Sequence, residues 1–73
     1  VPESQDVAVL YALTAALAKK ATKDNVAKVF QYLKRLPEEF GGFCAKAMLH
    51  RDKNLGRTKA FTAYAVNNQD VLL

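Results

Sequence analysis

Residues 26–48 read VAKVFQYLKRLPEEFGGFCAKAM, and they carry one apolar spacing twice, on either side of Pro37. Apolar residues recur at i, i+3, i+4 and i+7 before the proline, and the same spacing returns after it. The two sets are Val26, Val29, Phe30 and Leu33, then Phe40, Phe43, Cys44 and Ala47, with Met48 one position further. This spacing is typical of helices that bury one face. The stretch therefore predicts an all-α fold in which two helices meet at a break.

A first helix is predicted over about residues 5–21. Glu3 and Asp6 place negative charge near its start, and Lys19 and Lys20 place positive charge in its last turns, which suits the helix dipole. Alanines supply helix propensity along its length. Its predicted inner face consists of Val7, Leu10, Leu13, Ala16 and Leu17.

The remaining boundaries follow from capping and breaking signals. The second helix is expected to end at about Arg35, because the residue before a proline avoids the helical region. The third helix begins at Pro37 and lasts to about Arg51, and a polar connection over residues 52–57 follows it. Thr58 is a suitable cap for a fourth helix, which Asn67-Asn68 breaks. Residues 69–73 are expected to add a final turn that docks on the core, which completes a compact bundle of four to five short helices.

The glycine pair Gly41-Gly42 lies inside the third helical pattern and has two interpretations. Two glycines cost roughly 1 kcal/mol each against alanine in a helix. Either another helix approaches closely at this point, or the helix proper begins after the pair. We prefer the close approach, because Phe40 keeps the phase of Phe43 and Cys44.

Length and composition indicate one domain over residues 1–73. The chain starts at Val1 without an initiator Met, which suggests a fragment of a longer protein. The apolar run 7–17 is shorter than the roughly 20 residues that span a bilayer, and acidic residues precede it where a signal peptide needs basic ones. Together with the single thiol Cys44, expected in the core, these features favour a soluble cytoplasmic protein with no membrane contact.

The motifs of common enzyme classes are missing from the sequence. Phosphate-binding glycine loops do not occur, Ser4 is the only serine, and the adjacent Glu38 and Glu39 point about 100° apart on a helix. His50 and Cys44 are the only residues of their types, so the spacing of a zinc site is absent. We therefore expect a non-enzymatic chain with no catalytic residue, no cofactor and no metal.

The net charge of +4 suggests a second hypothesis, direct binding of DNA or RNA. Much of the excess positive charge lies in two segments, and a basic patch of this kind neutralises phosphates. The candidate nucleic-acid-binding residues are Lys34, Arg35, Arg51, Lys53, Arg57 and Lys59. Tyr11, Tyr32 and Tyr64 would stack on bases if they were exposed near these residues. The alternative is an ordinary solvated surface.

A high apolar fraction in a short chain favours contacts with another protein. Apolar residues make up 51% of the sequence, and burial against another domain would add to the marginal stability expected of so short a chain. The candidate protein-interaction residues are Tyr32, Leu36, Leu49, Val71 and Leu72.

Three segments of the chain resemble the helical C-terminal region of phage-type AAA ATPases. They are the run YLKRLPEEF at residues 32–40, HRD at 50–52 and TKAF at 58–61. The resemblance implies an accessory role beside an ATPase domain in replication or transposition: packing on that domain, sensing its nucleotide, or contacting DNA or replication partners. In AAA lid domains an arginine at a helix start reaches the nucleotide phosphate. Arg57 is the only candidate by position, and its spacing departs from the family pattern. Our leading hypothesis is thus a helical interaction module, with nucleic-acid binding as the alternative.

Overall fold

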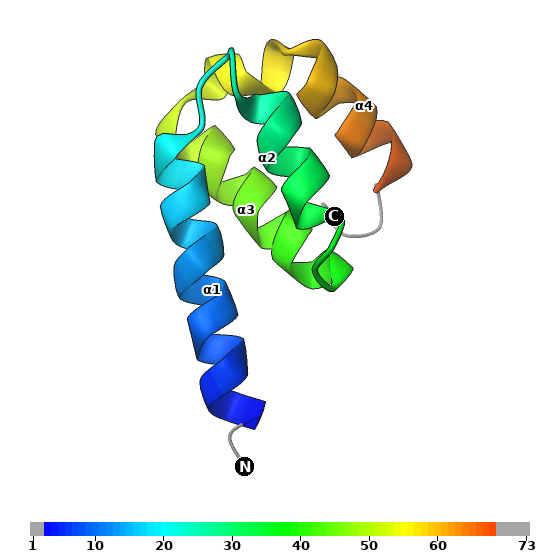
Figure 1. Cartoon of the computed structure of the whole chain (residues 1–73). Coiled ribbons are helices and arrows are strands. Elements are labelled where there is room, and N and C mark those ends of the chain that lie inside the picture. Colours follow the sequence, from blue (N-terminus) through cyan, green and yellow to red (C-terminus); the bar gives the residue numbers. More distant parts are fainter. Residues whose placement is uncertain (1–2, 69–73) are drawn as a thin grey trace.

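The computed structural model describes residues 3–68, with side chains from Asp6 onward, and contains four α-helices and one 3-10 helix (Figure 1). The α-helices are α1 (Glu3–Lys20), α2 (Val26–Leu33), α3 (Glu38–Arg51) and α4 (Lys59–Asn67), and the 3-10 helix is η1 (Lys53–Arg57). No strand occurs among residues 3–68. The predicted all-α bundle is confirmed, and the final turn predicted for residues 69–73 lies outside the described residues.

The helices form two parallel pairs. Tyr11 of α1 packs on Phe40 near the start of α3, and Arg51 at the end of α3 bonds to Ala18 near the end of α1, so these two helices run in the same direction. Helices α2 and α4 also run together and line one cleft along their length. The turn at Pro37 reverses the chain between α2 and α3, and α1 extends past the start of α3 (Figure 1).

The stripe predicted for α2 forms one side of the core, as expected. Its four apolar residues, Val26, Val29, Phe30 and Leu33, are all buried. Helix α2 ends at Leu33, two residues before the predicted end, and residues 34–36 form a turn into Pro37.

The buried face of α3 is rotated from the predicted stripe. Phe40, Cys44 and Met48 are buried as expected, but Phe43 is 39% exposed and Ala47 is half-buried. Gly41, Gly42 and Ala45 are buried in addition, because α3 contacts α1, α2 and η1 and needs a broad buried face.

The predicted inner face of α1 is wrong in part. Thr14 and Ala18 are buried, whereas Val7 and Ala16 are exposed and the predicted leucines are half-buried. Helix α1 is apolar on every side, so its sequence periodicity does not select one face. Thr14 is tolerated inside because its hydroxyl donates to the carbonyl oxygen of Tyr11 at 3.0 Å.

The glycine pair lies within a continuous helix, and a close approach explains Gly41. A Cβ atom added there would lie 2.5 Å from the Tyr64 hydroxyl oxygen. The close approach that we preferred is therefore found at Gly41, and the neighbour is a side chain of α4.

The connection after α3 has regular structure that the sequence interpretation did not anticipate. Residues 53–57 form η1, and the buried side chain of Leu55 joins it to the core. Asp52 caps η1 by accepting from the backbone N–H of Asn54 at 3.0 Å. The predicted cap of α4 is confirmed, since the Thr58 hydroxyl accepts from the N–H of Phe61 at 3.2 Å.

Candidate interaction surfaces

Helix α1 exposes apolar side chains along much of its length. No side chain is charged between Val7 and Ala18. Within this range Val9 is 64% exposed and Val7 is 43% exposed, and three alanines, Ala8, Ala12 and Ala16, are exposed as well. Apolar helices without a polar side are normally enclosed, but α1 packs mainly on α3.

The exposure of Val7 follows from the length of α1. Val7 lies two turns before the buried Thr14, so both residues belong to the same side of the helix. Near its start, α3 packs on Tyr11, whose ring centroid lies 4.8 Å from that of Phe40 and 5.0 Å from that of Phe43. The first turns of α1 extend beyond the start of α3 (Figure 1), and Val7, on the side that faces the core, is 43% exposed.

The opposite side of α1 forms a second apolar strip. Residues 9, 12, 13 and 16 follow the i, i+3, i+4, i+7 spacing and place Val9, Ala12, Leu13 and Ala16 together. We call these four residues the outer face of α1. Three of them are exposed and Leu13 is half-buried.

Arg51, a predicted nucleic-acid-binding residue, has a structural role. Its Nε donates to the carbonyl oxygen of Ala18 at 3.0 Å, and its Nη2 donates to the carbonyl oxygen of Ala21. These carbonyls lie at the end of α1, where the helix lacks internal donors. Arg51 thus ties the end of α3 to the end of α1.

The other predicted nucleic-acid-binding residues divide into two groups. Lys53, Arg57 and Lys59 lie on η1 and at the start of α4, close to the end that Arg51 joins. Lys34 and Arg35 follow the last turn of α2, at the other end of that helix. The predicted patch is therefore not a single surface.

The structure adds three lysines that sequence reasoning did not include. Lys19 and Lys20 end α1, Lys23 lies in the loop after it, and Lys19 lines one groove with His50 and Arg51. We define the basic end of the molecule as residues 19–24 and 50–59. Its cationic residues are Lys19, Lys20, Lys23, Arg51, Lys53, Arg57 and Lys59, beside the acidic residues Asp24 and Asp52. Finding this group required knowing that α1 and α3 run parallel.

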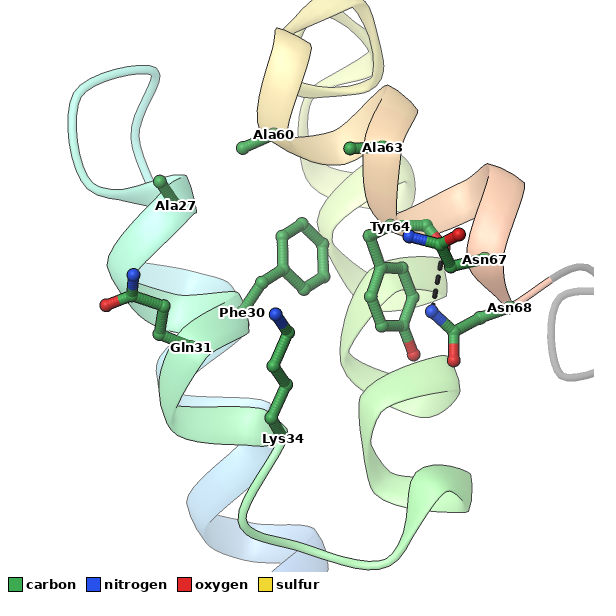
Figure 2. A pocket seen from close by; sticks show the side chains of 9 residues that line it. All are labelled: Ala27, Phe30, Gln31, Lys34, Ala60, Ala63, Tyr64, Asn67 and Asn68. Atoms are coloured by element: carbon green, nitrogen blue, oxygen red, sulfur yellow. Dashed lines mark hydrogen bonds between the residues drawn. The ribbon is translucent and has the colours of Figure 1, made fainter.

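Lys34 borders the cleft between α2 and α4, which has a volume of about 230 Å³ (Figure 2). The rings of Phe30 and Tyr64 stack inside it, with centroids 4.4 Å apart and planes 9° apart. At its lower rim the Asn68 side chain donates to the carbonyl oxygen of Tyr64 at 2.8 Å. The Tyr64 hydroxyl is buried without a hydrogen-bond partner, and burial raises its pKa. Because each ring covers one face of the other, a nucleobase cannot stack between them.

Of the predicted protein-interaction residues, those that the structure describes lie on different elements. Tyr32 is 42% exposed in the last turn of α2, and Leu49 is 38% exposed near the end of α3, beside Gly56. Leu36 is half-buried against the core. Val71 and Leu72 lie outside the described residues.

The described residues hold no group of three or more His, Cys, Asp or Glu side chains placed to bind a metal ion. In the same part of the chain, no helix combines the length and apolar character that a bilayer crossing requires. Cys44 is fully buried, and burial raises the pKa of its thiol to about 11.

Comparisons of the chain with protein-family models, with curated proteins and with solved structures gave no match. The resemblance of residues 32–61 to phage-type AAA ATPases therefore stays a prediction from the sequence.

Proposed function

We propose that the chain is a non-enzymatic helical module that binds another protein through the outer face of α1. One observation carries this proposal: α1 has no charged side chain from Val7 to Ala18, yet it packs mainly on a single neighbour, α3. Contiguous exposed apolar surface is a common mark of a protein-interaction site.

The composition of the outer face fits a helical partner. Ala12 and Ala16 are small, so the backbone of another helix approaches closely, and Val9 supplies a side chain that projects into the partner. Full burial of a valine contributes about 1.5–3 kcal/mol. The fitting occupant is the apolar face of a helix or of a small helical surface.

A second part of the proposal concerns which class of protein the partner belongs to. We propose that it is a nucleic-acid-processing ATPase domain, to which this module is an accessory C-terminal domain. The support is the resemblance of residues 32–40, 50–52 and 58–61 to phage-type AAA ATPases. Val9 would then be buried against the ATPase domain.

A photo-crosslinking amino acid at Val9 tests the proposal in the native protein. The matched control places the same amino acid at Lys28, which is exposed on α2. After irradiation in cells of the source organism, mass spectrometry identifies the peptides that are joined. The expected result is a protein crosslink at Val9 that is at least several times stronger than at Lys28.

Two different outcomes distinguish the protein-binding module from the assignment of an ATPase partner. Equal or absent protein crosslinks at the two positions would overturn the interaction module. A strong crosslink at Val9 to a protein with no nucleotide-hydrolysing domain would keep the module and overturn the ATPase assignment.

A further inference from the structure

We propose that the basic end binds the phosphate backbone of double-stranded nucleic acid without reading its sequence. The proposed contacts are Lys23, Lys53, Arg57 and Lys59, with Lys19 and Lys20 beside them. This site shares no residue with the outer face of α1, so it does not depend on the protein-binding role.

The basic end exists because of the helix arrangement. Helices α1 and α3 run parallel, so both finish at the same end of the molecule. The loop between α1 and α2 lies at this end with η1 (Figure 1), and Ala21, Val26 and Leu55 belong to one core cluster. Lysines that are some thirty residues apart in the sequence are therefore brought to one end.

Helix capping explains only part of this charge. Cations stabilise helix C-termini, which accounts for Lys19, Lys20 and the hydrogen bonds of Arg51. Lys23 lies in a loop, and Lys53 and Lys59 lie at the starts of η1 and α4, where a positive charge opposes the helix dipole. Helix ends therefore do not account for these three exposed lysines, and a bound polyanion would neutralise them.

The acidic side chains at this end do not cancel the excess. Asp52 uses its carboxylate to cap η1, and Asp24 is the only other acidic residue in the basic end. His50, which belongs to the basic end, is exposed in the last turn of α3 and adds a further donor.

The side chains available at the basic end favour a duplex over a single strand. Single-strand binders stack bases on exposed aromatic rings. Tyr11 and Tyr64 pack against phenylalanines, and Tyr32 lies in the last turn of α2, away from this end. Charge contacts alone suit the regular phosphate rows of a duplex, and membrane surfaces usually also require apolar anchors.

Fluorescence anisotropy with a labelled mixed-sequence DNA duplex of about 20 base pairs tests the site at about 50 and 200 mM NaCl. Four neutralised phosphates predict that affinity falls by roughly 100-fold between these concentrations. The test variant is Lys53→Gln with Arg57→Gln, and the matched control is Lys34→Gln with Arg35→Gln, which removes the same charge from the other end of α2. We expect the test variant alone to weaken binding at low salt by about tenfold or more and to reduce the salt slope by about two.

Several outcomes would overturn the inference. They are no duplex binding at 50 mM NaCl, binding that does not weaken with salt, or equal losses in the test and control variants. Tighter binding to a single strand of the same length, or to vesicles of anionic lipid, would assign the charge to a different ligand and also overturn it. Circular dichroism establishes whether each variant is folded. If the Lys53→Gln with Arg57→Gln variant does not fold, Lys23→Gln with Lys59→Gln replaces it.

Discussion

At the scale of single residues, Tyr64 approaches Gly41 too closely for a larger residue to fit there. The Tyr64 hydroxyl is buried without a partner, while its ring stacks on Phe30. An unpaired buried hydroxyl costs about 1–3 kcal/mol. The stacked ring and its apolar contacts offset this cost, and they hold the hydroxyl oxygen where only a glycine fits beside it.

Gly41→Ala is expected to destabilise the chain. The added Cβ would lie 2.5 Å from the tyrosine oxygen, and overpacking of about 1–3 kcal/mol exceeds the roughly 1 kcal/mol that alanine gains in a helix. Tyr64→Phe should be neutral or stabilising by up to about 1 kcal/mol, because it removes the unpaired hydroxyl. The double variant should recover most of the loss. Urea unfolding followed by circular dichroism measures all three, and an unchanged stability of Gly41→Ala would contradict the close contact.

The Cys44 thiol is expected to react slowly while the chain is folded. Burial raises its pKa from the ordinary value of 9.0 to about 11, so near pH 8 little of the thiol is ionised, and its sulfur is buried. The thiol contribution to stability is fully present below about pH 9 and is lost as pH rises toward 11, because only the unfolded chain ionises easily in that range. Labelling by a disulfide reagent with and without urea measures the protection. Equal rates in the two conditions would show that Cys44 is accessible.

At the scale of helices, α1 is held to the body mainly by α3. Its ring contacts lie near Tyr11, and the hydrogen bonds of Arg51 fasten its last turn. The two attachments lie toward opposite ends of the stretch that α1 shares with α3. The first turns of α1 lie beyond them.

Arg51→Lys is expected to loosen the end of α1. The planar guanidinium donates to two carbonyls at once, and a lysine ammonium does not reproduce that geometry. A loss of about 1–2 kcal/mol in unfolding free energy should result. Arg57→Lys, at an exposed position on η1, is the control and should change stability by less than about 0.5 kcal/mol. Similar losses in both variants would argue against the capping role.

Ala12→Glu is expected to leave the isolated chain folded and to abolish partner binding. Ala12 is exposed, so the charge meets water in the free chain, and stability should change by less than about 0.5 kcal/mol. In a complex the same carboxylate would be buried without a partner, which is costly. Crosslinking from Val9 measures the loss, with Ala27→Glu on α2 as the control. Undiminished crosslinking in Ala12→Glu would place the docking surface elsewhere.

At the scale of the whole molecule, charge is distributed unevenly between its ends. The basic end holds most of the lysines and arginines, whereas Asp6, Glu38 and Glu39 lie near the opposite end. Like charges close together repel, and salt weakens this repulsion over about 10 Å at 0.1 M ionic strength.

Thermal stability is therefore expected to rise with salt. Raising NaCl from about 10 to about 200 mM should increase Tm by a few degrees, because the repulsion at the basic end is screened. Lys53→Gln with Arg57→Gln should flatten this dependence, and Lys34→Gln with Arg35→Gln should not. Melting curves by circular dichroism at several salt concentrations measure the effect. A Tm that falls with salt in the parent chain would contradict the charge distribution described above.

The sequence by itself determined the helices and most of their ends. The apolar spacing of residues 26–33 selected the buried face of α2, and Thr58 and Pro37 marked where later helices begin. These signals are local: spacing and capping act within a few residues, so they are readable without knowing the fold.

Only the tertiary structure decided which side of α1 is buried and which charged residues lie at the same end of the molecule. Helix α1 is apolar all round, so no periodicity in it selects a face, and the choice came from the position of α3. The basic end required the parallel packing of α1 on α3, which brings Lys19 and His50 to one groove. Contacts between residues distant in the sequence depend on how whole helices pack, and that packing is set by the sum of many weak contacts rather than by any single motif.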